Sequence, residues 1–144
     1  MKNVTELLKS KPDRAMVTVR PEDTVLDAIK ILAREDIGAA VVVSGDRLVG
    51  IFSERDYTRK VVLKGRHSET TKVEEIMTAN VVCVSPRAKT RDCMALMSEK
   101  NIRHLPVVEE GRVVGMVSIR DIVTDIIADQ DFTISQLEHY ISGQ

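Results

Sequence analysis

The segment GIFSERD at residues 50–56 decides the fold of this chain, because it returns as GMVSIRD at residues 115–121. The same spacing of 65 residues aligns Val19 with Val84 and Pro21 with Pro86, and no gap is needed between residues 17 and 56. A repeat of this kind fixes the architecture before any single helix or strand is considered. The repeat therefore predicts that the chain folds as two related halves. It also suggests that ligands would bind between these halves, in two related sites.

The composition is that of an ordinary globular protein. The 144 residues are enough for one compact domain, which buries roughly 68–70% of its unfolded surface. Lys and Arg number 21 and Asp and Glu number 22, whereas a general nucleic-acid binder normally carries a basic face. Aromatic residues make up only 3% of the chain, so a base-stacking platform is not expected. We expect no nucleic-acid partner.

The cysteines and the N-terminus indicate a compartment. Two thiols, Cys83 and Cys93, do not make the disulfide framework of a secreted protein. Residues 1–6 lack the apolar run of a signal peptide, and no stretch approaches the ~20 apolar residues that span a bilayer. We expect a reduced, cytoplasmic protein with no membrane partner.

Each half is predicted to run strand, helix, strand, strand, helix. Apolar side chains recur at i, i+3, i+4, i+7 and i+8 from Val25, which is typical of an amphipathic helix, and Asp23 or Thr24 can cap its start. Two short apolar runs around a turn-rich segment predict a hairpin. The elements expected in the first half are a strand at 17–19, a helix at 24–36, strands at 39–43 and 48–52, and a helix from Ser53 to about Leu63.

The second half repeats this order and adds a last segment. Its helix is expected to turn Cys93, Met94 and Met97 inward. The expected elements are a strand at 81–84, a helix at 89–101, strands at 105–108 and 113–117, a helix from 119 to about 129, and an amphipathic segment at 133–141 with Ile134, Leu137 and Ile141 on one face. The predicted domains are an N-terminal segment at 1–14, repeats at 15–63 and 73–130, a polar linker at 64–72, and a helical tail at 131–144.

Several short motifs occur in a fixed order. They are IMT at residues 76–78, the proline after the first strand of each half, IRHLPVV at residues 102–108, and the duplicated Gly-x-x-Ser-x-x-Asp. With these motifs the chain resembles the cystathionine β-synthase (CBS) domain family over residues 15–60 and 78–127. The resemblance implies an α/β (α+β) fold in which two β-α-β-β-α repeats pack through their sheets with pseudo-two-fold symmetry, plus a C-terminal helix. It also implies clefts for adenosine-containing ligands and modules that dimerise into a flat disc.

The duplicated motif has the chemistry to hold a nucleotide. An ionised carboxylate, Asp56 or Asp121, can accept hydrogen bonds from both hydroxyls of a ribose. Ser53 and Ser118 stand at a helix start, where a hydroxyl and free backbone N–H groups suit a phosphate. Ser-x-x-Asp is also a capping-box pattern, in which these side chains satisfy the helix itself. The sequence leaves both interpretations open.

Arg103 and His104 are further candidates for phosphate contact, because many members of the family carry basic residues in this place. A guanidinium matches phosphate oxygens; the alternative is a solvated arginine beside a histidine that packs near a strand. The first half has Gly38 and Ala39 here, so the two sites are expected to differ.

Family precedent mixes both halves in each cleft. One cleft would join Ser53 and Asp56 to Arg103, His104 and the strand around Cys83, and would tolerate or prefer more phosphate charge than the other cleft. The other would join Ser118 and Asp121 to Thr18, Gly38 and Ala39. Thr18, Ala39 and Cys83 are the candidate adenine contacts. Arg55 and Arg120, which precede each aspartate, are candidate phosphate contacts or ordinary surface charges. Gly50 and Gly115 would let a ligand or another chain segment approach the strand closely.

Other functions fit the sequence less well. Cys83 and Cys93 have no local signature of a nucleophile with His104, and the histidines at 67, 104 and 139 lack metal-ligand spacing. We therefore expect no catalytic residue, no metal and no required cofactor. The predicted function is a regulatory module that senses AMP, ADP, ATP, NAD or S-adenosylmethionine, with AMP or NAD favoured, and modulates an unknown protein target as a homodimer. The alternative is a ligand-independent dimerisation or protein-interaction module of the same fold.

Overall fold

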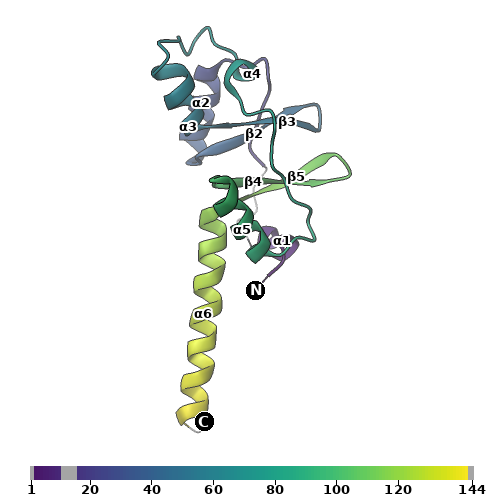
Figure 1. The fold of residues 1–144 in the computed structure, drawn as a ribbon, viewed down its shortest axis with the longest axis vertical. Helices are drawn as coiled ribbons and strands as arrows, with labels where there is room; N and C mark the ends of the chain where they lie inside the picture. The colour runs from purple at the N-terminus through teal and green to yellow at the C-terminus, as the bar shows by residue number, and fades with distance from the viewer. Residues whose placement is uncertain (1, 11–15, 143–144) are drawn as a thin grey trace.

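A computed structural model describes residues 2–10 and 16–142 of the chain. The structure is an α/β arrangement around a five-stranded sheet with the order β1-β2-β3-β5-β4 (Figure 1). Its elements in chain order are α1 (Val4–Lys9), β1 (Thr18–Val19), α2 (Val25–Glu35), β2 (Ala39–Ser44), β3 (Arg47–Ser53), α3 (Glu54–Asp56), a π-helix η1 (Tyr57–Val62), α4 (Val73–Ile76), α5 (Thr90–Lys100), β4 (His104–Glu109), β5 (Arg112–Ser118) and α6 (Ile119–Ser142).

The two predicted hairpins form the centre of the molecule. Strands β2 and β3 pair antiparallel, as do β4 and β5, and both ladders shift register at equivalent places, after Val42 and after Val107. The hairpins meet edge to edge at Arg47 and Arg112. Figure 1 shows α2, α3 and α4 around the first hairpin and α1 and α5 beside the second. The prediction of two related units that join through their strands is confirmed.

Helix α2 begins and ends as its sequence predicts. The Thr24 hydroxyl accepts a hydrogen bond from the Asp27 N–H at 3.2 Å, which satisfies one of the free donors of the first turn. Asp36 ends the helix in the left-handed conformation, with φ 53°, a conformation that Asp tolerates better than most residues. Val25, Ala28 and Leu32 of its apolar face are buried, whereas Ala33 is exposed. The helix predicted at 24–36 agrees with α2 to within one residue at each end.

Helix α5 turns Cys93 and Met97 into the second core, as predicted, but the inward placement of Met94 is wrong. The Met94 side chain is exposed. Successive residues of an α-helix point about 100° apart, so Met94 lies at the edge of the face that carries Thr90, Cys93 and Met97, where its side chain is only partly covered.

The strand predicted at residues 81–84 is reduced to a single bridge between Val84 and Val107. The Val84 N–H donates to the Pro106 carbonyl, and the Val108 N–H donates to the Val84 carbonyl. Pairing Cys83 with Pro106 in the same register would need an N–H at position 106, which proline lacks. The first repeat has Val41 at this position, and there Thr18 and Val19 form a regular parallel strand with β2.

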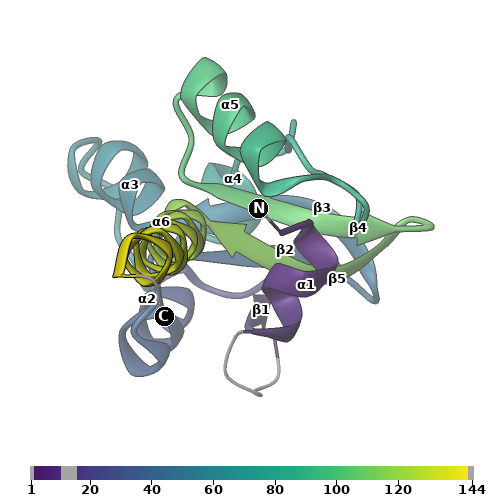
Figure 2. The same ribbon diagram turned by 90° about the horizontal axis from the view of Figure 1, so that it is seen from below.

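The two closing helices differ. After Ser53 the first repeat makes one turn of α-helix and then the π-helix η1, in which the Leu63 N–H reaches the Thr58 carbonyl. In the second repeat, the helix predicted to end near residue 129 continues to Ser142 as the single helix α6. Figure 2 shows α6 end-on.

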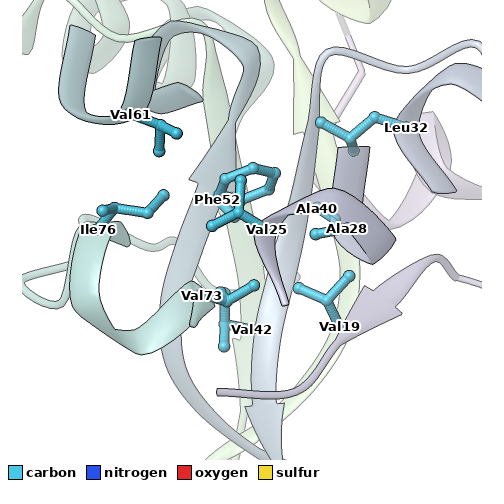
Figure 3. Packing of buried hydrophobic residues seen from close by; sticks show 10 residues of the cluster. All are labelled: Val19, Val25, Ala28, Leu32, Ala40, Val42, Phe52, Val61, Val73 and Ile76. Carbon is cyan, nitrogen blue, oxygen red and sulfur yellow. The ribbon is translucent and has the colours of Figure 1, made fainter. Parts of the chain in front are cut away.

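Each repeat is completed by a short helix that belongs to the other half of the sequence. Residues 4–8 read VTELL and residues 73–77 read VEEIM. Helix α1 precedes the first repeat but buries Val4 and Leu7 in the second core. Helix α4 precedes the second repeat but buries Val73 and Ile76 in the first core, around Phe52 (Figure 3). The two repeats therefore exchange their leading helices.

The predicted linker packs against the first repeat. The N–H groups of Val25 and Leu26, at the start of α2, donate to the carbonyls of Thr71 and Ser68. Next to it, the Glu75 carboxylate accepts from the Lys72 backbone N–H at 2.7 Å, which lowers the pKa of Glu75. The domain boundary predicted between residues 14 and 15, and the end of the tail at 143–144, lie outside the described residues.

Candidate functional site

A cavity of about 680 Å³ lies between the two repeats. The first repeat contributes Val17 and the segment from Asp36 to Ala39. The second repeat contributes Arg103, His104, part of β5 and the start of α6. A volume between 300 and 1,000 Å³ is typical of small-molecule sites.

Hairpin β4–β5 brings the polar residues of the cavity together. His104 and Ser118 are paired across the two strands. The Ile119 N–H, at the start of α6, donates to the Arg103 carbonyl at 2.8 Å. Arg103 and His104 are therefore fixed beside the second copy of the duplicated motif.

Ser118 and Asp121 make a reciprocal cap at the start of α6. The Ser118 N–H donates to Asp121 Oδ2 at 2.9 Å, and the Asp121 N–H donates to Ser118 Oγ at 3.1 Å. Both residues are half-buried and line the cavity. The capping-box interpretation thus holds here, and it fixes one carboxylate oxygen toward the helix start.

In the first copy of the motif the aspartate is buried and has a lysine as its ion-pair partner. Asp56 is 8% exposed, and its Oδ2 accepts from both the N–H and the hydroxyl of Ser53 at 3.0 Å. Its Oδ1 lies 3.0 Å from Lys60 Nζ, which also donates to the Ile76 carbonyl. Ser53, Arg55 and Asp56 do not line the 680 Å³ cavity.

The lysine that neutralises Asp56 is replaced in the second repeat by an acid. Lys60 corresponds to Asp125 at the repeat spacing of 65, so the second repeat carries Asp121 and Asp125 one helical turn apart. Asp125 is 4% exposed, and Lys2 Nζ lies 3.7 Å from its Oδ1. Neither of its carboxylate oxygens has a hydrogen-bond partner among the described residues. Comparison of positions 60 and 125 could have revealed this charge reversal from the sequence.

The predicted grouping of residues into two clefts needs a correction. Arg103 and His104 were expected beside Ser53 and Asp56, but they line the same cavity as Ser118 and Asp121. The reason is the hairpin register, which puts His104 directly opposite Ser118. Gly38 of the first repeat borders His104: a Cβ at Gly38 would make an ordinary contact of 3.7 Å with the imidazole Cε1.

Some of the remaining predicted site residues line the cavity and others do not. Ala39 and Arg120 line the cavity together with Arg103, His104, Ser118 and Asp121. Thr18 and Cys83 are exposed and lie outside its lining. Burial raises the pKa of the Cys93 thiol, and the charge of Asp92 raises it further, which suits a core residue rather than a thiolate nucleophile.

The two motif glycines admit segments of the chain itself. A Cβ at Gly50 would lie 2.5 Å from Met77 Sδ, and the Ile51 N–H and carbonyl pair with Thr78. A Cβ at Gly115 would lie 2.9 Å from both terminal carbons of Leu8. The exchanged helices α4 and α1 therefore end against equivalent places on β3 and β5. The sequence motif predicted a close approach but not which segment makes it.

The part of the chain that the structure describes lacks two kinds of feature. Within it, no helix is both long and apolar enough to cross a membrane. Within it also, no group of three His, Cys, Asp or Glu side chains is arranged to hold a metal ion.

Comparisons with known proteins agree with the repeat. The model of the CBS domain family matches residues 4–63 and 73–128. The chain is 38% identical to a CBS domain-containing protein, CBSX3, mitochondrial, of Arabidopsis thaliana, over 97% of this chain and 72% of that protein.

Solved structures of similar proteins share the fold. A structure described as a putative signal-transduction protein with CBS domains, from Burkholderia ambifaria, has 53% identity and a TM-score of 0.86, and covers 90% of this chain and 96% of that one. A CBS domain protein from Pyrobaculum aerophilum, complexed with AMP, has 27% identity and a TM-score of 0.74, and covers 83% of this chain and 89% of that one.

Proposed function

Because the chain belongs to the CBS domain family, we propose that it is a regulatory module that binds an adenine nucleotide in the cavity between its two repeats. One observation carries this proposal. The second Gly-x-x-Ser-x-x-Asp motif shares a cavity with Arg103 and His104, so groups suited to a ribose and to a phosphate surround one space.

Each part of a nucleotide has a candidate partner. The Asp121 carboxylate accepts from the ribose hydroxyls, since charge-assisted hydrogen bonds of this kind are strong. The N-terminus of α6 and the guanidinium of Arg103 bind phosphate, which the helix dipole and the planar donors both favour. Val17, Ile37 and Ala39 form an apolar wall for the adenine.

AMP and NAD are the ligands we favour, ahead of ADP, ATP and S-adenosylmethionine. All five carry the adenosine that Asp121 and the apolar wall would bind. AMP is supported further by the P. aerophilum relative, whose structure holds it.

Thermal melting with each of the five ligands tests whether the protein binds a nucleotide. A ligand that binds only the folded state, at 100 times its dissociation constant, raises the free energy of unfolding by about 2.7 kcal/mol. We expect an increase in the melting temperature with AMP or NAD. No shift with any of the five would favour the ligand-independent interaction module instead.

The phosphate role of Arg103 has its own test. We expect Arg103→Ala to weaken AMP binding while leaving adenosine binding nearly unchanged, because the guanidinium is proposed to contact only the phosphate. Arg55→Ala is the matched control, since Arg55 is exposed and lies outside the cavity. Equal losses for adenosine and AMP in Arg103→Ala would refute the phosphate role.

The proposed output is a change of arrangement that a partner protein senses. A ligand that binds between the repeats favours one relative arrangement over another and so shifts the population. The proposed assembly is a homodimer, and the relatives named above support a regulatory rather than an enzymatic role. Solution scattering with and without saturating AMP should show different dimer envelopes, and superimposable envelopes would contradict this output.

The cytoplasm is the proposed compartment, on the basis of the two cysteines in a chain without a disulfide. The A. thaliana relative is named as mitochondrial. Cell fractionation with organelle markers decides between the two.

A further inference from the structure

The C-terminal half of α6 carries an apolar face that nothing in the described chain covers. Figure 1 shows α6 running far beyond the sheet. Every described side chain from Gln130 to Ile141 is exposed. Ile134 and Leu137 are 52% and 56% exposed, and Ile141 is 81% exposed. An isolated helical stretch of about 12 residues, such as the exposed part of α6, is marginal in water unless its apolar face packs against a partner.

Five exposed apolar residues of α6, together with Gln130, follow a heptad spacing. The six positions alternate in steps of four and three along the helix: Val123, Ile127, Gln130, Ile134, Leu137 and Ile141. Phe132 and Tyr140 are also exposed and lie outside this spacing. With Ile127 as position a of the heptad, the a positions are Ile and the d positions are Val, Gln and Leu. This is the seam of a coiled coil. We call these six residues the α6 seam.

The residue types of the α6 seam favour two strands. Among parallel coiled coils, β-branched residues at a with Leu at d favour dimers; here the three a positions are Ile, and Leu137 occupies one of the d positions. Gln130, at another d position, is the single polar residue of the seam. In a parallel pair each seam residue meets its own copy, so Gln130 meets Gln130 across the two-fold axis.

The charges beside the α6 seam favour the parallel orientation. Asp131 and Glu138 occupy e positions, whereas the g positions are Ile126, Thr133 and Tyr140. A parallel pair sets e against g, so each carboxylate faces an uncharged side chain. An antiparallel pair would set e against e and bring the carboxylates of the two helices together, which is destabilising.

We propose that the α6 seam binds the α6 seam of a second copy of this chain as a parallel two-stranded coiled coil. The inference rests on α6 alone and is independent of nucleotide binding. It gives the dimer a defined interface, which begins at Val123, two residues after the cavity-lining Asp121. A dimer that forms through other surfaces would leave the α6 seam exposed.

Site-specific disulfide crosslinking tests the coiled coil. In a Cys83→Ser background, Leu137→Cys places a thiol at a d position, and Gln136→Cys places one at the neighbouring exposed c position. Cys93 stays in place because it is buried. Under mild oxidation at equilibrium, we expect Leu137→Cys to become a covalent dimer of doubled mass and Gln136→Cys to stay a single chain on a non-reducing gel.

Two outcomes would overturn the coiled coil. One is a protein that sediments as a monomer, and the other is a dimer that crosslinks equally at both positions or not at all at Leu137. Phe132→Asp and Ile134→Asp provide a second comparison by sedimentation. Both place a carboxylate on the exposed helix, but only Ile134→Asp is in the α6 seam and should weaken the dimer. Circular dichroism checks that both variants remain folded.

Discussion

Positions 60 and 125 distinguish the two copies of the duplicated motif. Lys60 lies 3.0 Å from Asp56, whereas Asp125 places a second carboxylate on the helix that carries Asp121. To bind a ribose hydroxyl, the buried Asp56 carboxylate would have to give up its ion pair with Lys60, and breaking a buried ion pair is costly. Asp121 lines the cavity and Asp56 does not, so Asp121 is the one of the two aspartates that we propose for ligand binding.

The motif glycines allow a test of the close approach of α4 and α1. We expect Gly50→Ala to lower the free energy of unfolding by about 1–3 kcal/mol, because the new methyl group would meet both Met77 and the Thr78 carbonyl. Gly115→Ala should cost less, since it meets only the flexible end of Leu8. Gly38→Ala, whose Cβ would have ordinary contacts, is the control in urea denaturation. Equal stability of all three variants would contradict this packing.

The sequence predicted which residues are candidates for ligand binding better than it predicted which of them share a cleft. It identified Ser118, Asp121, Arg103 and His104 as candidates, and the structure brings them together. It assigned Arg103 to the wrong copy of the motif, because residue types alone do not reveal which strands pair. That information comes from the register of β4 with β5.

Among the elements, the second repeat lacks the regular first strand that the first repeat has. We attribute this to Pro106 and expect Pro106→Val to extend the pairing of residues 82–84 with β4. In hydrogen exchange, the new amide at position 106 should be protected and the Val84 amide should exchange more slowly than in the unmodified protein. A rapidly exchanging amide at position 106 would show that another cause limits the strand.

Helix ends were predicted where capping residues mark them. Thr24 and Asp36 enclose α2, and Asn101 ends α5 in the left-handed conformation. The predicted end of a helix near residue 129 is wrong, because residues 119–142 contain no Gly or Pro that would end it.

On the scale of the whole molecule, the exchange of α1 and α4 joins the two repeats into one structure. The repeat itself was predicted from the sequence, but the exchange was not, because it depends on contacts between segments far apart in the chain. The similarity of VTELL and VEEIM at residues 4–8 and 73–77 indicates that the two helices are equivalent. It does not reveal which core each helix enters.

The exchange predicts that α1 is essential to the second core. We expect Leu7→Ala to lower the free energy of unfolding by about 2–5 kcal/mol, because Leu7 is buried with Met97 and Leu105. Lys9→Ala on the exposed side of α1 should stay within about 0.5 kcal/mol of the unmodified protein. Guanidinium denaturation measures both, and a loss below 1 kcal/mol for Leu7→Ala would mean that α1 is a dispensable tail.

The central claim is that an adenine nucleotide binds beside Asp121. Isothermal titration calorimetry of AMP into the unmodified protein, Asp121→Asn and Asp56→Asn tests it most directly. Asparagine keeps a carbonyl oxygen for the helix cap but removes the charge, so we expect Asp121→Asn to weaken AMP binding roughly 10- to 100-fold. Asp56→Asn should bind AMP as the unmodified protein does. An absence of binding heat in the unmodified protein, or equal affinity in the unmodified protein and Asp121→Asn, would contradict the account.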